Sequence, residues 1–483
     1  MAELKKDSLS FAEALGQSVA NASPTFTPAL GVGVVVGMAG VSAWFVYGVA
    51  TLALIVVSIN VATLAKRIPC AGSFFIYVSR SLGPLWGMMT GWAMVWSYLV
   101  NSIAMTVATS ILIKALLASL GSNAAVSSVF IYSVISLLLW IFAYRDIRLS
   151  SRMGLVLEAI SMTIILVVCI ATWSRLGFQA DARQLKLQGA TFSGTAEAVL
   201  FVLYSYSGFE SSATLGQETR DPHVVIPRAI VLTPAIAGVF MMFTTYVICL
   251  GFGDNISNLT SSAAPLSELA SHLSSWLAVA VYFGAMISIF ASALASINGS
   301  ARMLYSMGRY RFLHQSMGRV HSRHKTPHWA VTTCVIINLA TLLVMPKVGE
   351  IELLGYLGLT ASFGYIVIYI ACSIAAPVYL SLIKKLSKRA LMLGVIGATV
   401  MSLALIGSVY PIPLYPYDCF IYLFLAYMVI GAGWFVALKR RTPQVLQDLE
   451  KDLEIDLEPE SEGDFIAEVD GDRIPRLQER SSA

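Results

Sequence analysis

The sequence LYSYSGFESS at residues 203–212 places many hydroxyl groups, a glycine and an acid inside an otherwise apolar segment. Packing against lipid does not explain them, because unpaired polar groups are costly in hydrocarbon. Gly208 permits backbone conformations that other residues avoid. The segment therefore predicts a membrane helix that breaks near Gly208. We expect a helix to resume after the glycine, with its free N–H groups directed at an anion such as a carboxylate.

The composition of the whole chain points to a membrane as its solvent. Of the 483 residues, 57% are apolar and only 12% are charged, about half the charged share of an average soluble domain. The apolar runs are continuous, whereas the strands of outer-membrane barrels alternate apolar and polar residues. These runs predict an all-α, polytopic membrane protein.

Apolar runs that are separated by charged or Pro/Gly clusters predict about 12 transmembrane helices. They lie near residues 14–38, 42–64, 84–117, 126–144, 153–174, 194–215, 229–252, 276–306, 328–345, 354–382, 390–409 and 418–438. This divides the chain into an N-terminal segment (1–13), a transmembrane domain of 12 helices (14–440) and an acidic, disordered tail (441–483).

The basic residues predict the orientation of the spans. If the N-terminus is cytoplasmic, the expected outer loops hold only five of the 32 Lys and Arg: Lys114, Arg175, Arg183, Lys186 and Lys347. The other 27 then lie on the cytoplasmic side, as the positive-inside rule requires. We expect a multi-pass protein of the cytoplasmic membrane with both termini inside.

The first span contains Asn21-Ala22-Ser23-Pro24-Thr25, where a second break is expected. Pro24 lacks a backbone N–H and clashes with the preceding helical turn. A kink that serves only helix packing is the alternative. The two breaks lie in spans one and six, and transporters built from two inverted five-helix repeats break the first helix of each repeat. Both breaks together favour a substrate site between helices 1–5 and 6–10, with helices 11–12 outside the repeats.

Three stretches resemble the amino acid/polyamine/organocation transporter family, in its bacterial amino acid permease form. The most specific reads FVLYSYSGFE (201–210), followed by ETRDP (218–222) and IPRAI (226–230). The second, PCAGSFFIY (69–77), is similar to the loop between helices two and three of the family. The third, ARMLYSMGR (301–309), is similar to the end of helix eight.

The resemblance implies roles for residues at both breaks. Backbone groups at Ala22, Ser23, Pro24 and Thr25 would hold a substrate carboxylate, and the carbonyls of Ser205, Tyr206 and Ser207, beside Gly208, would receive its amine. Tyr204 falls where relatives place an aromatic gate, and Glu210 where some place a proton-responsive acid. Tyr98 and Asn101 are expected to add lining. Many relatives carry Gly-x-Gly at the first break, whereas this chain has Ser-Pro-Thr.

Glu158 lies inside the fifth span, and a lone carboxylate at membrane depth is a candidate proton carrier. The alternative is an ion pair near the cytoplasmic edge with Arg145, Arg148 or Arg152. Some relatives couple transport to protons through a lysine in this helix, where this chain has Ser161. Ser288 and Ser292 offer oxygens for sodium, although such hydroxyls more often bond their own helix.

The expected function is secondary active transport of amino acids or related amines by alternating access, with proton symport. Exchange is the alternative, and a membrane sensor without transport is a more distant one. A small-molecule substrate and the lipid bilayer are the expected partners. No nucleic acid, cofactor, catalytic group or metal site is expected, and the coupling ion is H⁺ with Na⁺ left open.

Overall fold

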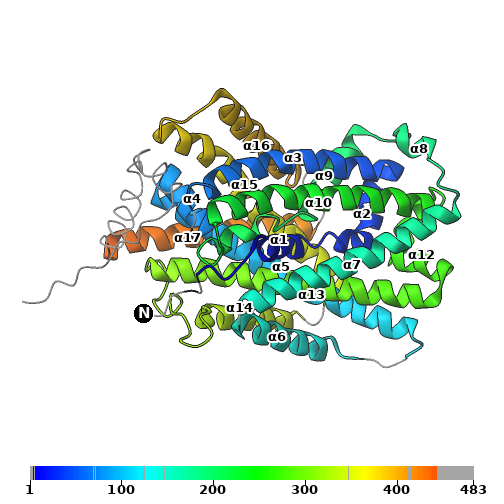
Figure 1. Ribbon diagram of the computed structural model, residues 1–483, viewed down its shortest axis with the longest axis horizontal. Coiled ribbons are helices and arrows are strands. Elements are labelled where there is room, and N and C mark those ends of the chain that lie inside the picture. Colours follow the sequence, from blue (N-terminus) through cyan, green and yellow to red (C-terminus); the bar gives the residue numbers. More distant parts are fainter. Residues whose placement is uncertain are drawn as a thin grey trace, which may run out of the picture.

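The computed structural model describes residues 4, 6–68, 70, 72–122, 126–145, 147–262, 264–345, 348–410 and 415–442. The expected acidic tail lies outside these residues, apart from its first two positions. Within them the chain folds into a bundle of helices without a β-sheet (Figure 1). An isolated bridge between Leu9 and Thr219 ties the N-terminal segment to the bundle.

The first half of the chain contains two interrupted spans. Its helices are α1 (Phe11–Ala22), α2 (Val32–Ala39), α3 (Ala43–Ala65), α4 (Ser73–Leu82), α5 (Pro84–Ser119), α6 (Ser128–Arg145), α7 (Ile147–Arg175), α8 (Ala182–Leu185) and α9 (Phe192–Tyr204). A π-helical stretch over Thr27–Gly31 leads into α2, and a 3₁₀ helix over Ser211–Leu215 follows α9.

The second half consists mainly of long helices. They are α10 (Pro222–Gly251), α11 (Ile256–Ser261), α12 (Pro265–Leu273), α13 (Ser275–Arg309), α14 (His328–Val344), α15 (Glu350–Leu382), α16 (Lys388–Gly407) and α17 (Tyr417–Arg441). Both α5 and α10 begin at a proline, which suits the first helical position because the amide there has no partner in the helix.

Each of the twelve expected spans coincides with helix, so the all-α polytopic fold is confirmed. Among the described residues, nine stretches are long and apolar enough to cross a membrane, and the first of these, Phe11–Ala65, contains two expected spans. The apolar helices Phe192–Tyr204 and His328–Val344 are shorter. No comparison of the two halves tests the inverted repeat, which stays a prediction.

Helix α5 runs through the centre of the bundle between α13 and α15. Glycines allow this close approach, because a Cβ on Gly299 would lie 2.6 Å from the ring of Tyr98. A Cβ on Gly364 would lie 2.0 Å from Oγ of Ser97. Small residues at helix contacts stabilise membrane bundles through closer van der Waals packing. The central position of α5 brings its polar side chains next to the two breaks.

Candidate functional site

The first break follows α1, which ends at Ala22. Ser23 adopts a left-handed conformation with φ 43°, and its amide still bonds the carbonyl of Val19 at 2.9 Å. Pro24 offers no amide, and the amide of Phe26 bonds the carbonyl of Ser23 at 2.9 Å. The chain then turns into the π-helical stretch. The predicted break is therefore present at Ser23 and Pro24.

The second break follows α9, which ends at Tyr204. Residues 205–210 form successive turns, and Gly208 adopts φ 92°, which L side chains rarely occupy. We expected a helix to resume after Gly208, and the helix that follows is of the 3₁₀ type. It is five residues long, and α10 begins only at Pro222. Its tighter turns fit the dense packing around Ser211 and Ser212, both fully buried.

The two breaks touch each other. A Cβ on Gly208 would lie 2.4 Å from Nδ2 of Asn21, the residue two positions before the first break. Glycine is therefore required at position 208 both for its backbone conformation and for the space it leaves. This contact joins segments that are almost two hundred residues apart in the sequence.

A small enclosed cavity of about 10 Å³ lies at this junction. Its lining includes six of the predicted substrate residues: Ala22, Ser23, Asn101, Tyr204, Ser205 and Ser207. The other five predicted residues do not line it: Pro24, Thr25, Tyr98, Tyr206 and Gly208. A cavity of this size accommodates about one water molecule, so an amino acid fits only after the surrounding helices move apart.

Two buried polar atoms beside the cavity lack a hydrogen-bond partner among the described residues. They are Nδ2 of Asn21 and Oγ of Ser205, both from residues that line the cavity. Leaving a buried donor unsatisfied costs about 1–3 kcal/mol, so such atoms are rare in well-packed regions. Ser205 lies beside the hydroxyl of Tyr47, whereas Nδ2 of Asn21 lies against Gly208, so a polar ligand at the junction of the breaks would satisfy the Asn21 donor.

A chain of side-chain hydrogen bonds holds the cavity wall in place. The hydroxyl of Tyr204 donates to Oδ1 of Asn101 at 3.0 Å, and Nδ2 of Asn101 donates to Ser296 at 2.9 Å. The Ser296 hydroxyl in turn donates to Oδ1 of Asn21 at 2.6 Å. The chain links α9, α5, α13 and α1, and it fixes the orientation of the Asn21 amide towards Gly208.

Glu158 lies in the middle of α7 and is 1% exposed. Oγ of Ser288 donates to one carboxylate oxygen and also bonds Oγ of Thr25, and it lies 3.2 Å from Oγ of Ser23. The other oxygen, Oε1, is buried and makes no hydrogen bond of regular geometry with the described residues, although the hydroxyl and the amide of Thr25 lie beside the carboxylate. Glu158 is thus connected to the first break through one serine.

The alternative pairing of Glu158 with arginine is not what the structure shows. Arg148 and Arg152 lie instead near Glu13 of α1, with N···O distances of 3.3 and 3.8 Å. The hydroxyl of Ser292 bonds the backbone carbonyl of Asn21 at 2.9 Å, so it reaches across to another helix instead of bonding its own. The same holds for Ser288.

Glu210 forms a second buried carboxylate cluster. Tyr98 donates to Oε1 at 3.1 Å and Tyr369 donates to Oε2 at 2.7 Å. These bonds tie the second break to α5 and α15. The side chain of Tyr206 points elsewhere and bonds Thr51 at 2.7 Å. Tyr98 and Tyr206 therefore support the site through these hydrogen bonds and do not line the cavity.

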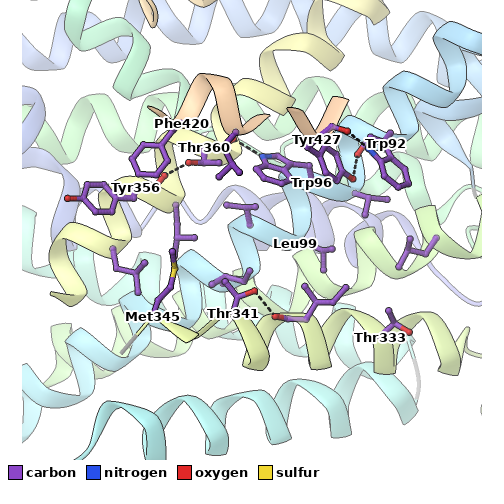
Figure 2. Close-up of a pocket in the computed structure, with 18 of the residues that line it drawn as sticks. Trp92, Trp96, Leu99, Thr333, Thr341, Met345, Tyr356, Thr360, Phe420 and Tyr427 are labelled. Carbon is purple, nitrogen blue, oxygen red and sulfur yellow. Dashed lines mark hydrogen bonds between the residues drawn. The ribbon is translucent and has the colours of Figure 1, made fainter. Parts of the chain in front are cut away.

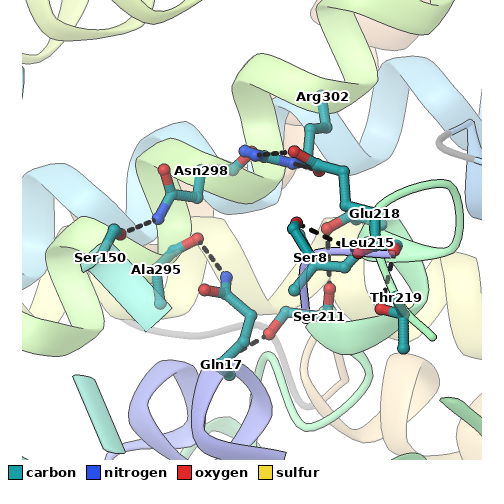
Figure 3. A network of polar contacts seen from close by, with 11 residues as sticks. Ser8, Gln17, Ser150, Ser211, Leu215, Glu218, Thr219, Ala295, Asn298 and Arg302 are labelled. Atoms are coloured by element: carbon teal, nitrogen blue, oxygen red, sulfur yellow. Dashed lines mark hydrogen bonds and ion pairs between the residues drawn. The ribbon is translucent and has the colours of Figure 1, made fainter. Parts of the chain in front are cut away.

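A buried polar network connects α13 with the loop before α10 and with the N-terminal segment (Figure 3). Arg302 of α13 makes two bonds to the carboxylate of Glu218, at 2.6 and 3.0 Å, and both side chains are almost fully buried. The backbone carbonyl of Glu218 accepts the amides of Ser8 and Leu9. Nearby, Gln17 donates to the carbonyl of Ala295 at 3.0 Å.

Sequence reasoning missed four residues that line the cavity: Asn21, Phe26, Met105 and Ser292. Asn21 was quoted only as part of the first break. A signal was available for Met105, because it lies one helical turn beyond Asn101 on the same face of α5. Nothing in the sequence indicated that the amide of Asn21 meets Gly208.

Known proteins that are similar to this chain are named as transporters or permeases. The chain is 27% identical over 289 residues to the low-affinity putrescine importer PlaP of Escherichia coli; the match covers 58% of this chain and 62% of that protein. It is 23% identical over 325 residues to the branched-chain amino acid permease BcaP of Bacillus subtilis, covering 62% and 66%.

A third relative covers more of both chains. It is an uncharacterized transporter of Mycobacterium tuberculosis, 29% identical over 354 residues, which are 72% of this chain and 75% of the relative. The family model described as amino acid permease matches residues 17–447, nearly the whole helical part of the chain and both breaks. The chain therefore belongs to the amino acid permease family.

Proposed function

We propose that this protein is a secondary active transporter, which carries amino acids or related amines across the cytoplasmic membrane by alternating access. The observation that carries the proposal is the unpaired Nδ2 of Asn21, at the junction of two broken membrane helices. Broken helices in transporters supply backbone groups for ions and substrates at membrane depth. Family membership and the named relatives support the same reading.

The two ends of an amino acid match the two breaks. A carboxylate would accept the unpaired amide N–H of Asn21, beside the backbone of Ser23 and Pro24. An ammonium group would donate to carbonyls at the second break. There the carbonyl of Tyr206 already accepts the amide of Phe209 at 3.2 Å, which leaves the carbonyls of Ser205 and Ser207 as acceptors. Both of these residues line the cavity.

Proton symport is the coupling that the buried acids support best. Glu158 holds one oxygen without a regular hydrogen bond at membrane depth and contacts the first break through Ser288. Gain or loss of a proton there changes which groups Ser288 bonds, and so acts on Ser23 and Thr25. Glu210 is the second candidate, but both its oxygens accept hydrogen bonds from tyrosines. These bonds would break when the site opens.

In alternating access, the substrate site opens to only one side of the membrane at a time. The contacts that close the protein on that side must break when it opens. The Arg302–Glu218 ion pair and the bonds of the N-terminal segment to Glu218 close the protein on the side of α4 and the N-terminus. We place that side in the cytoplasm because of the distribution of Lys and Arg along the sequence. Opening there would separate α13 from the loop before α10.

Uptake by purified protein in proteoliposomes tests the proposal. With an inward proton gradient, we expect saturable accumulation of at least one amino acid or amine, which collapses when a protonophore is added. Accumulation that needs a substrate on the opposite side, and ignores the proton gradient, would show exchange instead. If neither uptake nor counterflow occurs for any tested amino acid or amine, transport is excluded and a sensor becomes the better reading.

A further inference from the structure

A large apolar cavity lies far from the helix breaks, between α5, α14, α15 and α17 (Figure 2). Its volume is about 570 Å³, within the range of about 300–1,000 Å³ that holds small-molecule ligands in proteins. Trp96 and Leu99 of α5 face Thr341 of α14 and Tyr356 of α15 across it, as Figure 2 shows. The lining is almost entirely hydrocarbon and aromatic.

The cavity is separate from the substrate site because α5 stands between them. Trp96, Leu99 and Ile103 line the apolar cavity. From the same helix, Asn101 and Met105 line the cavity between the breaks. Opposite faces of one helix therefore serve two different sites.

The polar atoms around the apolar cavity are already bonded to protein. The indole N–H of Trp92 donates to the carbonyl of Tyr427, and that of Trp96 donates to the carbonyl of Thr360, both at 3.0 Å. The Thr341 hydroxyl donates to the carbonyl of Ile337 at 2.9 Å. Water in a cavity needs two to four polar partners. These groups leave little for water or a polar ligand to bind, so the cavity fits an apolar occupant.

The cavity has the length and the opening that an acyl chain requires. Its lining on α14 and at the residue that follows it runs from Thr333 to Met345, a separation of twelve residues or about 18 Å along the helix axis. One leaflet of the hydrocarbon core is about 15 Å thick, half of roughly 30 Å. Ile337 and Leu423, which line the cavity, are 39% and 52% exposed. They belong to α14 and α17, so a chain that enters from the bilayer would pass between these two helices.

One end of the cavity is lined by residues from a segment that is rich in basic residues. Leu313, His314 and Met317 line this end. They belong to the segment 309–325, which connects α13 to α14 and contains five Lys and Arg and no acid: Arg309, Arg311, Arg319, Arg323 and Lys325. Exposed basic residues at a membrane surface attract anionic lipid headgroups. An apolar slot with a basic end is complementary to an anionic phospholipid.

We propose that this cavity binds one acyl chain of an anionic phospholipid from the surrounding bilayer, with the phosphate beside His314. The occupant fills space that would otherwise leave the lining without van der Waals partners. It also packs against the outer faces of α5 and α15, whose inner faces carry Asn101 and Tyr369.

Native mass spectrometry of the full chain tests this proposal. Protein is exchanged into dioleoyl phosphatidylglycerol, stripped of loose lipid, and compared with a Thr333→Phe/Thr341→Phe variant in which two rings fill the cavity. The control is Thr163→Phe, at an exposed position of α7. Wild type and control are expected to retain one phosphatidylglycerol per protein. In the double variant, the fraction of protein with bound phosphatidylglycerol is expected to be at least tenfold lower. Equal retention by the double variant and wild type, or none by wild type, would overturn the acyl site.

A second measurement addresses the headgroup and the position of the chain. Exchange into a mixture with dioleoyl phosphatidylcholine should leave phosphatidylglycerol enriched on wild type, and the enrichment should fall at least threefold in His314→Ala. Equal binding of both lipids would remove the headgroup contact. Phospholipid brominated in the acyl chain should also quench the tryptophan fluorescence of wild type. The quenched fluorescence should fall in Trp96→Phe by more than the loss of one average tryptophan explains. No difference would show that the chain stays outside the cavity, even if the double variant failed to fold.

Discussion

At the scale of single residues, the site depends on a few polar atoms whose partners are missing or shared. Asn21 uses its carbonyl oxygen for Ser296 and leaves its amide N–H groups at the cavity. Glu158 uses one oxygen for Ser288 and leaves the other without a regular hydrogen bond in the described part of the chain. Such atoms are costly at membrane depth, and a functional site is the usual reason that they persist. The first two predictions concern these two residues.

The Asn21→Asp change replaces the unpaired N–H₂ by a carboxylate oxygen and keeps the oxygen that accepts the Ser296 hydroxyl. A substrate carboxylate then meets a like charge in place of a donor, and a hydrogen bond to a charged group contributes about 1.5–3 kcal/mol. We expect the Kd for a transported amino acid to rise by about tenfold or more, measured by calorimetry. Asn258→Asp, at an exposed position of α11, is the control. An unchanged Kd would remove Asn21 from the site.

The Glu158→Gln change keeps the shape of the side chain and its contact with Ser288 but cannot carry a proton. If Glu158 is the proton carrier, accumulation driven by a pH gradient is lost while substrate counterflow persists. Both are measured in proteoliposomes, with Glu197→Gln on the exposed side of α9 as the control. Accumulation that keeps its response to the gradient would point to Glu210 as the carrier.

At the scale of elements, the two helix breaks could be predicted, but their geometry could not. Pro24 and Gly208 predict the two breaks, because proline lacks a backbone N–H and glycine tolerates positive φ. The contact between Gly208 and Asn21, and the short 3₁₀ helix after the second break, depend on packing between distant segments. Tyr206 shows the same limit, because its position in the motif does not reveal that its side chain bonds Thr51.

Gly208→Ala tests the contact between the breaks. Alanine at φ 92° is strained by about 1–2 kcal/mol, and its Cβ would also lie 2.4 Å from Asn21. Gly189→Ala is the control, since Gly189 has φ 81° and nothing within 4 Å of the added Cβ. We expect Gly208→Ala to lower the melting temperature more than Gly189→Ala and to weaken substrate binding. If both variants had equal effects on melting temperature and substrate binding, the contact between Gly208 and Asn21 would contribute to neither property.

A carboxyl pair between the loops next to α8 and α10 predicts a pH dependence of stability. Burial, together with a hydrogen bond and the charge of Asp181, raises the pKa of Asp254 to about 6, above its usual 3.8. The folded protein therefore binds more protons than the unfolded chain between about pH 4 and 6, and its stability falls as the pH rises through that range.

Asp254→Asn should remove this dependence, because an amide does not repel Asp181. Thermal melting between pH 4 and 8 is expected to show a decline from pH 4 to 6 in wild type and a flatter profile in the variant. Glu268→Gln, an exposed change on α12, serves as the control. A wild-type melting temperature that instead rises between pH 4 and 6 would contradict a raised pKa of Asp254.

At the scale of the whole molecule, the helices and the family could be predicted from the sequence. The apolar runs follow from the bilayer core, and the charged loops follow from the water on either side of it. The sequence was not sufficient for the closed state. Glu218 and Arg302 lie in the family-like stretches 218–222 and 301–309, yet their buried ion pair was not foreseen. The same holds for the cavity behind α5, since Trp92 and Trp96 read as ordinary apolar residues in the sequence.

Glu218→Gln tests the role of the buried ion pair in closing the protein. Removing one partner of such a pair leaves a buried charge and costs about 3–5 kcal/mol. We expect a lower melting temperature and faster labelling of Ala295→Cys by a maleimide, in a background without the six native cysteines. Glu352→Gln, an exposed change on α15, is the control. Labelling at the wild-type rate would mean that the ion pair does not close this side.

The central claim is that a substrate binds between the two helix breaks and is carried across the membrane. The most direct measurement is uptake of radiolabelled amino acids and amines into proteoliposomes by wild type, Asn21→Asp and Asn258→Asp. The account predicts saturable uptake by wild type and Asn258→Asp, and a half-saturation concentration at least tenfold higher for Asn21→Asp. Absence of saturable uptake by wild type, or an unchanged half-saturation concentration in Asn21→Asp, would contradict it.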